Sequence, residues 1–292
     1  MPGQNPRNRH GIRSSRRVLG VAVPLVVGLA ALTACENGNA APDTFDYVAL
    51  GDSFTATGLP EAREPCYRST QNYPQLIAQA RADLTLIDVS CGAASTEDML
   101  KPQEILGRVQ SPQFNALSPD TDLITVSLGG NDYDLYSTFL YRCVELAPQD
   151  PDGDPCRTAN GGRLERRIDE VRDNLVAVLE EAHDRAQEAR VIVVGYPRLL
   201  PDEGECPRRV PVAAGDVDFV REMMSLLVDA QKGAAEDAGV EYIDVFAASE
   251  GHDICSDAPW VNGVKNGPQG AYAFHPMPAH QRAVAELILE IL

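Results

Sequence analysis

The stretch YVALGDSFTATG, Tyr47 to Gly58, runs from strand-forming residues straight into a Gly-Asp-Ser turn. Its first four residues are aliphatic or aromatic and are typical of a buried strand. A serine just past the carboxyl end of such a strand lies where α/β enzymes bind ligands and place nucleophiles. Asp52 and Ser53 are also good helix-capping residues, so by themselves they favour a helix start over a nucleophile.

The rest of the chain alternates similar apolar runs with helical patterns. We expect further strands at 84–89, 123–128, 191–194 and 242–246, and helices at 73–84, 164–188, 217–238 and 278–292. Strands that alternate with helices indicate a parallel sheet covered on both faces. The sequence therefore predicts an α/β fold whose functional residues gather at the carboxyl ends of the strands.

Residues 1–34 are typical of a leader and not of a folded domain. Five arginines precede an uncharged run from Val18 to Ala34, and no acidic residue occurs before Glu36. Such a segment indicates a secretory signal peptide. A retained transmembrane helix is the alternative, although the run has only 17 residues and includes Pro24.

The leader ends in LTAC, Leu32 to Cys35, which resembles the lipobox of bacterial lipoproteins. That resemblance implies lipidation of Cys35 and attachment to the outer face of the cell membrane; without the lipid the chain would be secreted. Residues 35–43 contain too little apolar surface to fold and are expected to form a flexible tether. Residues 44–292 have the length of one large domain.

The charge of the chain excludes two classes of partner. The formal net charge is −18, and removal of the five leader arginines lowers it to −23. Such a polyanion is repelled by nucleic acid and by anionic lipid head groups, so we expect neither as a partner. Membrane attachment should then depend on the lipid at Cys35.

Six cysteines remain when the lipobox cysteine is set aside: Cys66, Cys91, Cys143, Cys156, Cys206 and Cys255. In an exported chain, and without the short paired spacings of a zinc site, six cysteines indicate three disulfides. Fifteen pairings are possible, and the sequence does not select one. We expect pairing in chain order, because each neighbouring pair brackets one loop-rich segment.

Three further segments carry groups suited to acyl transfer. SCGAAST follows the second expected strand and places Gly92 at a tight turn, where its backbone N–H can face outward. GGNDY follows the third and supplies the side-chain amide of Asn131, and AFHPMPAHQ places His275 just before the last helix. In this interpretation Ser53 attacks, His275 accepts and returns its proton, and three donors hold the oxyanion.

The order GDS, glycine, GGND and HP, each beside an expected strand or the last helix, resembles the GDSL esterases and lipases of the SGNH-hydrolase superfamily. Within it, the chain is similar to the secreted, three-disulfide branch typical of actinobacteria, from about Tyr47 to the C-terminus. The resemblance implies a flavodoxin-like three-layer sandwich with a five-stranded parallel sheet, and no metal or organic cofactor. It also implies that Ser53 is the nucleophile and that the Ser53 N–H, the Gly92 N–H and the Asn131 amide form the oxyanion hole, with His275 as the base.

The sequence departs from the family pattern beside the histidine. Many relatives have an aspartate three residues before it, where this chain has Tyr272. In the secreted branch that the chain resembles, a backbone carbonyl can orient the imidazole instead, and we expect the carbonyl of Tyr272 to do so, with Asp253 and Asp257 as open alternatives. His280 is a rival base, but it lies in a helical pattern and is expected to be solvated.

We therefore expect a monomeric carboxylic ester hydrolase that acts through an acyl-enzyme on a neutral ester or lipid. Two alternatives stay open. The same groups could deacetylate cell-wall polysaccharide or transfer acyl groups between lipids, or the chain could be a lipid- or glycan-binding lipoprotein that has lost turnover. The presence of all four family residues argues against loss of activity.

Overall fold

The computed structural model describes residues 44–57, 65–267 and 271–292. The expected signal peptide, lipidation site and tether, residues 1–43, lie outside these ranges. Residues Ala41–Leu292 form one compact unit. The central sheet, both hydrophobic cores and three disulfides belong to this unit, so it contains what a domain needs to fold on its own.

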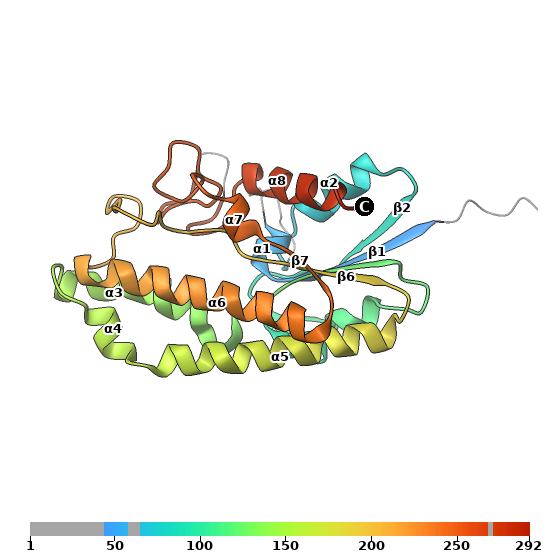
Figure 1. The fold of residues 1–292 in the computed structure, drawn as a ribbon, viewed down its shortest axis with the longest axis horizontal. Coiled ribbons are helices and arrows are strands. Elements are labelled where there is room, and N and C mark those ends of the chain that lie inside the picture. The colour runs from blue at the N-terminus through green and yellow to red at the C-terminus, as the bar shows by residue number, and fades with distance from the viewer. Residues whose placement is uncertain (1–43, 58–64, 268–270) are drawn as a thin grey trace, which may run out of the picture. The chain divides into compact units, whose positions relative to one another are not determined.

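A five-stranded parallel sheet forms the centre of the unit (Figure 1). Its strands, in spatial order, are β2 (Leu84–Asp88), β1 (Phe45–Gly51), β5 (Leu123–Ser127), β6 (Arg190–Val194) and β7 (Glu241–Ile243). Counted along the chain this is the order 2-1-3-4-5 of flavodoxin-like folds. The predicted α/β fold with a five-stranded parallel sheet is confirmed.

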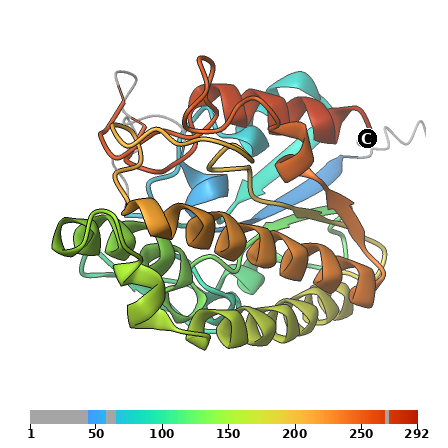
Figure 2. The ribbon, with the colours of Figure 1, turned by 60° about the vertical axis from the view of Figure 1, so that its left-hand side comes forward.

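Helices cover both faces of the sheet, as Figures 1 and 2 show. α5 (Arg163–Arg185) and α6 (Val217–Ala238) pack together on one face, and α2 (Tyr73–Ala80) and α8 (Pro278–Leu289) on the other. The connections contain α1 (Ser53–Ala56), α3 (Cys143–Leu146), α4 (Pro155–Asn160), α7 (Val245–Ala248) and a hairpin of β3 (Gln103–Ile105) and β4 (Arg108–Gln110). Within the described ranges, no helix has both the length and the apolar character that a membrane span requires.

Strand β1 shows why the central strands are continuous apolar runs. Val48 and Leu50 belong to the core that α5 and α6 cover, whereas Tyr47 and Ala49 belong to the core beneath α2 and α8. Successive side chains of a strand point to opposite faces, so a strand buried on both sides must be apolar at every position.

The expected elements differ from the structure mainly at the last strand. The apolar run at 242–246 was expected to be one strand, but β7 ends at Ile243 and Val245 begins helix α7. Asp244 separates the two because its carboxylate accepts the backbone N–H of Ala247 at 2.9 Å and caps the helix. The β3–β4 hairpin was not expected.

The three disulfides join Cys66 to Cys91, Cys143 to Cys156 and Cys206 to Cys255. The predicted pairing in chain order is confirmed. Three disulfides indicate that the chain folds in an oxidising compartment and is exported from the cytoplasm.

Candidate active site

The strand order reverses between β1 and β5, and in open α/β sheets the crevice at such a reversal is where ligands bind. Ser53 follows the end of β1, and Asn131 follows the end of β5. The two ends are adjacent because Gly51 pairs with Ser127 in the sheet. The topology therefore brings the GDS and GGND segments to the same point.

Ser53 is the first residue of α1 and is 8% exposed. Asp52 caps this helix, since its carboxylate accepts the backbone N–H of Phe54 at 2.8 Å. Ser53 lines a cavity of about 350 Å³ together with His275 and Gly92, here called the Ser53 cavity. The helix-cap interpretation is thus correct for Asp52, while Ser53 itself lies where a substrate could reach it.

Two buried glutamines from distant parts of the chain hold the GDS turn by hydrogen bonds to its backbone. The Gln113 amide accepts the N–H of Gly51 at 2.8 Å and donates to its carbonyl at 2.9 Å. Gln281, on α8, donates to the carbonyls of Phe54 at 3.0 Å and Thr57 at 2.7 Å. The position of the serine is therefore held by segments far away in the sequence.

His275 lies in a turn before α8, and its Nδ1 is 2.8 Å from the carbonyl of Ala273. The prediction that the Tyr272 carbonyl orients the ring is wrong. That carbonyl accepts the backbone N–H of His275 at 3.1 Å, so it is used to close the turn. A proton on Nδ1 donates to Ala273 and leaves Nε2 as the basic nitrogen.

Tyr141 supports the same carbonyl. Its hydroxyl donates to the Ala273 oxygen at 2.6 Å and lies 3.4 Å from Nδ1 of His275. Neither of the two alternative aspartates is hydrogen-bonded to the His275 imidazole. Asp253 accepts the N–H of Cys255 at 2.8 Å, and Asp257 is exposed. No sequence motif around Tyr141 indicates that its hydroxyl supports the Ala273 carbonyl.

Burial lowers the pKa of His275 below its usual 6.5, and its hydrogen bond to the Ala273 carbonyl acts in the opposite direction. Desolvation has this effect because it disfavours the charged imidazolium. A histidine that is neutral at pH 7 is in the state that a general base requires.

Tyr196 links the two turns of the site. Its hydroxyl donates to the carboxylate of Asp52 and accepts the N–H of Gly130 at 3.0 Å. Burial raises the pKa of Asp52 to about 7, although the hydrogen bonds from Tyr196 and Phe54 lower it. Sequence reasoning missed Tyr196, because nothing in VVGYPRLL indicates a side chain that reaches across to β1.

The expected oxyanion donors are only partly brought together. Gly92 lines the Ser53 cavity, but its N–H donates to the Cys66 carbonyl at 2.9 Å and does not face outward as expected. Asn131 lines a different cavity, of about 570 Å³, here called the Asn131 cavity. Its amide nitrogen donates to the Ala94 carbonyl at 2.9 Å, which uses one of its two N–H groups.

Asp132 braces the GGND turn. Its carboxylate accepts the backbone N–H of Thr96 at 2.9 Å and the Asn174 amide at 3.2 Å. The next two residues, Tyr133 and Asp134, have φ of 54° and 58°, a region that costs energy for residues other than glycine. The hydrogen bonds of the buried Asp132 carboxylate to Thr96 and Asn174 hold the turn that carries Asn131.

His280 contradicts the expectation that it is solvated. It is 2% exposed and lies edge-on to Phe54 and Trp260. Its position on α8 faces the core because the neighbouring Gln281 and Val284 are buried as well. Burial lowers the pKa of His280 to about 3.

We expect His280→Leu to reduce the loss of stability in acid. The folded pKa is below the unfolded value near 6.5, so the folded state is fully stable above pH 6.5 and loses stability as pH falls. At pH 5 this loss is about 2 kcal/mol, and the leucine variant should lack it. Urea unfolding at pH 7.5 and pH 5 measures the difference.

The matched control is His183→Leu, because His183 is exposed. This control should lose as much stability between the two pH values as the unsubstituted chain. An equal loss in His280→Leu would contradict the assignment.

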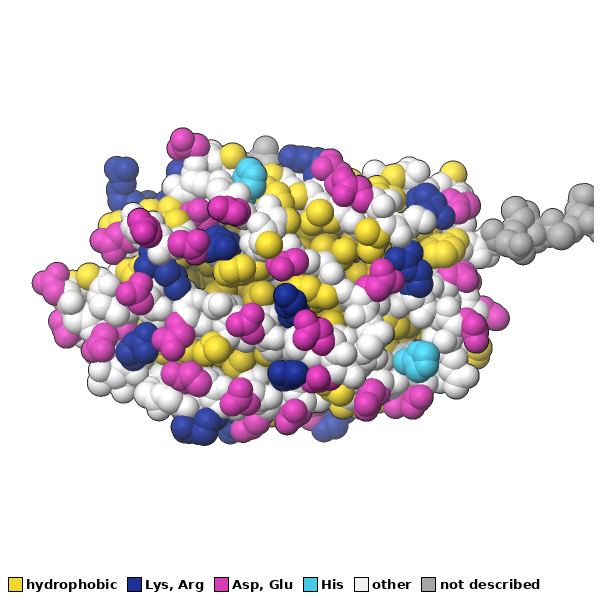
Figure 3. All heavy atoms as spheres, viewed as in Figure 1, with side chains coloured by type: hydrophobic (Ala, Val, Ile, Leu, Met, Phe, Trp, Pro, Cys, Tyr) yellow, Lys and Arg dark blue, Asp and Glu magenta, His cyan; other side chains and the backbone are white. Residues whose placement is uncertain are grey.

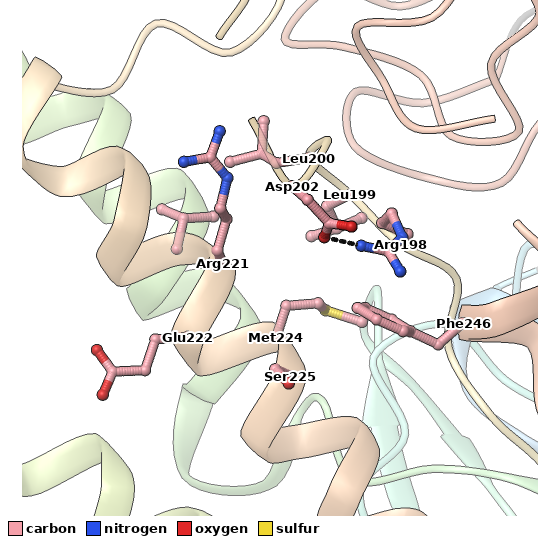
Figure 4. A pocket seen from close by; sticks show the side chains of 10 residues that line it. Arg198, Leu199, Leu200, Asp202, Arg221, Glu222, Met224, Ser225 and Phe246 are labelled. Atoms are coloured by element: carbon pink, nitrogen blue, oxygen red, sulfur yellow. Dashed lines mark hydrogen bonds and ion pairs between the residues drawn. The ribbon is translucent and has the colours of Figure 1, made fainter. Parts of the chain in front are cut away.

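A separate pocket of about 320 Å³ lies between α6, α7 and the segment after β6 (Figure 4). In it Arg198 pairs with Asp202 and lies 4.4 Å above the ring of Phe246. Figure 3 shows apolar side chains gathered over this region, between α6 and α8, with acidic side chains spread around them. None of the expected site residues lines this pocket, so the candidate site is the one at Ser53.

A serine at the first turn of a helix after a central parallel strand, with a histidine in the same cavity, defines the class of α/β serine hydrolases. The chain belongs to the GDSL-like Lipase/Acylhydrolase family, whose model matches residues 49–283.

Similar curated proteins and solved structures come from Streptomyces. Lipase 2 of Streptomyces coelicolor is 36% identical over 295 residues, which cover 95% of this chain and 97% of that protein. An esterase of Streptomyces scabiei is 32% identical over 285 residues, 83% of this chain and 82% of that protein.

Two crystal structures share the fold over 85% of this chain. Phospholipase A1 from Streptomyces albidoflavus has a TM-score of 0.67 with 26% identity over 99% of its chain, and the extracellular lipase of Streptomyces rimosus has 0.67 with 25% identity over 100%. The chain is therefore an exported carboxylic ester hydrolase.

Proposed function

We propose that this enzyme hydrolyses carboxylic esters through an acyl-enzyme on Ser53, with His275 as general base and acid. The observation that carries this proposal is that both side chains line one cavity while Nδ1 of His275 is held by the Ala273 carbonyl. This leaves Nε2 to exchange protons in the cavity.

In the first half-reaction Nε2 accepts the Ser53 proton while Oγ forms a bond to the ester carbonyl carbon. The negative charge then on the carbonyl oxygen would be held by the Ser53 N–H and the second N–H of the Asn131 amide. Collapse expels the alcohol, which receives the proton from Nε2. Water repeats the sequence on the acyl-enzyme and releases the carboxylic acid.

The imidazolium formed in each half-reaction is oriented by a carbonyl and not by a carboxylate. A carbonyl holds the Nδ1–H tautomer but stabilises the positive charge less than a carboxylate does. The Tyr141 hydroxyl, bonded to the same carbonyl, keeps that oxygen in place. Asp52 supports the serine turn and takes no part in proton transfer in this proposal.

A neutral ester or lipid is the substrate class that the site favours. Ile105, Tyr141 and Tyr272 line the Ser53 cavity and offer apolar surface to an acyl chain. The chain has a formal net charge of −18, which disfavours anionic substrates. The similar proteins named as lipases and as a phospholipase A1 support the same class.

A fluorophosphonate probe on residues 41–292 tests the proposal. We expect one adduct by intact mass, mapped to Ser53, together with hydrolysis of p-nitrophenyl esters. A series from acetate to palmitate then reports the preferred acyl length. A folded protein that shows neither adduct nor turnover would overturn the proposed function.

We also propose that the enzyme is anchored through a lipid on Cys35. Support comes from the uncharged run that ends in LTAC and from the disulfides, which indicate export. We expect the enzyme in the membrane fraction, with an intact mass that starts at a diacylglyceryl-modified Cys35. A mature N-terminus without lipid would contradict the anchor.

A further inference from the structure

The segment between Leu100 and Gln110 concentrates exposed apolar side chains. In the described part of the chain six large hydrophobic side chains are exposed, and three of them are Leu100, Leu106 and Val109, at 56%, 69% and 71%. Scattered single exposures are normal in proteins, but a cluster of this kind marks an interaction surface.

The turn of the β3–β4 hairpin has an unfavourable residue at its tip. Ile105 pairs with Arg108, so Leu106 and Gly107 form a two-residue loop. Both have positive φ, 50° and 69°, as a type I′ turn requires. Asparagine is the favoured first residue of such a turn, and leucine lacks the short polar side chain that tolerates it. A leucine at this position costs stability, and because Leu106 is 69% exposed, packing against the rest of the chain does not explain its presence.

This hairpin is part of the rim of the catalytic site. Ile105 lines the Ser53 cavity, and Leu100 lines the Asn131 cavity. Gln103 in β3 donates to the carbonyl of Gly92 at 2.9 Å and so ties the hairpin to the turn beside Ser53. The hairpin that carries the exposed Leu106 and Val109 therefore borders the Ser53 cavity through Ile105, while neither exposed side chain lines that cavity.

The charge of the hairpin also differs from that of the whole chain. Residues 100–110 include Lys101 and Arg108 but only one acidic residue, Glu104, which gives a formal charge of +1 against −18 for the chain. A zwitterionic lipid surface therefore meets little electrostatic repulsion at this segment. Aliphatic side chains flanked by basic ones suit the boundary between head groups and acyl chains.

We propose that the β3–β4 hairpin docks on a zwitterionic lipid surface, with Leu106 and Val109 entering it, and so presents the Ser53 cavity to ester bonds at that surface. This inference rests on the proposed ester hydrolysis for its function, although the docking itself does not depend on catalysis.

The test compares residues 41–292 with a variant that combines Leu106→Asn and Val109→Thr. Asparagine suits the left-handed turn, and threonine keeps the β-branched shape of a strand residue, so the hairpin should be preserved. The matched control is Ile291→Ser, because Ile291 is 40% exposed but lies in the C-terminal turn after α8.

The first readout is co-sedimentation with phosphatidylcholine vesicles, with Ser53→Ala in every protein so that no lipid is consumed. We expect the hairpin variant to require about tenfold more lipid for half-binding, and the control to bind like the parent. Equal binding by parent and hairpin variant, or no binding by the parent, would overturn the proposal.

The second readout uses Ser53 intact and compares a vesicle-embedded ester with water-soluble p-nitrophenyl acetate. We expect the hairpin variant to lose about tenfold in rate on the vesicle ester and to keep its rate on the soluble ester. Equal losses on both esters would overturn the proposal. If the parent hydrolyses neither ester, the proposed function fails, and vesicle binding still decides the docking.

Discussion

Replacement of Ser53 by alanine is expected to lower kcat for ester hydrolysis by about 10⁴-fold or more. The variant lacks the Oγ that forms the acyl-enzyme, so only the oxyanion donors and substrate binding still favour reaction with water. KM should change little, because binding to the apolar wall of the Ser53 cavity does not involve this hydroxyl. Steady-state kinetics with a p-nitrophenyl ester measure both values.

The fold of Ser53→Ala should be intact, which makes the result interpretable. The hydrogen bonds described around the turn use the backbone of residue 53 and the side chains of Asp52 and Gln281, and all of these remain. Ser69→Ala is the matched control, since Ser69 is also a buried serine but does not line the Ser53 cavity. It should keep kcat within about twofold. Substantial activity in Ser53→Ala would show that another group attacks the ester.

His275→Gln is expected to lower kcat by about 10³-fold, because glutamine can donate to the Ala273 carbonyl but cannot take the proton from Ser53. The probe adduct on Ser53 should also form far more slowly. His183→Gln, at an exposed position, serves as the control and should leave kcat unchanged.

The pH dependence gives a second, independent readout of His275. Its pKa is lowered by burial, so the enzyme with neutral imidazole predominates at lower pH than for an ordinary histidine. We expect kcat/KM to rise with pH, with its midpoint below 6.5, and then to level off. Any residual activity of His275→Gln should lack this rise of kcat/KM with pH. If the rise persists in the variant, another group titrates, and Asp52, with a pKa of about 7, is the candidate.

Patterns close together in the sequence predicted the larger part of the fold. The buried strands were visible because a strand covered on both faces must be apolar at each position, and the helices followed from their apolar stripes. The run at 242–246 was assigned incorrectly because short apolar runs fit a strand or a helix equally well. In the structure Asp244 caps helix α7 at this point, so the strand ends at Ile243 and the helix begins at Val245.

Predictions that depended on where a single backbone carbonyl or N–H points were less successful. The sequence placed a carbonyl near His275 but chose Tyr272, whereas the turn uses that oxygen for a backbone bond and directs Ala273 to the ring. The Gly92 N–H was expected to face outward and instead meets the Cys66 carbonyl. Such directions depend on φ and ψ at individual residues, which a sequence pattern does not specify.

By itself the sequence determined the parallel α/β architecture and the presence of Ser53 and His275 at a common site, whereas the expected cysteine pairing was one of fifteen until the structure confirmed it. These follow from periodicity, from the order of segments and from motifs within a few residues. Only the tertiary structure decided that Tyr196 joins the GDS and GGND turns, that His280 is buried, and that an exposed hairpin borders the cavity. Each of these depends on contacts between residues far apart in the chain, and those contacts exist only once the sheet has brought its strand ends together.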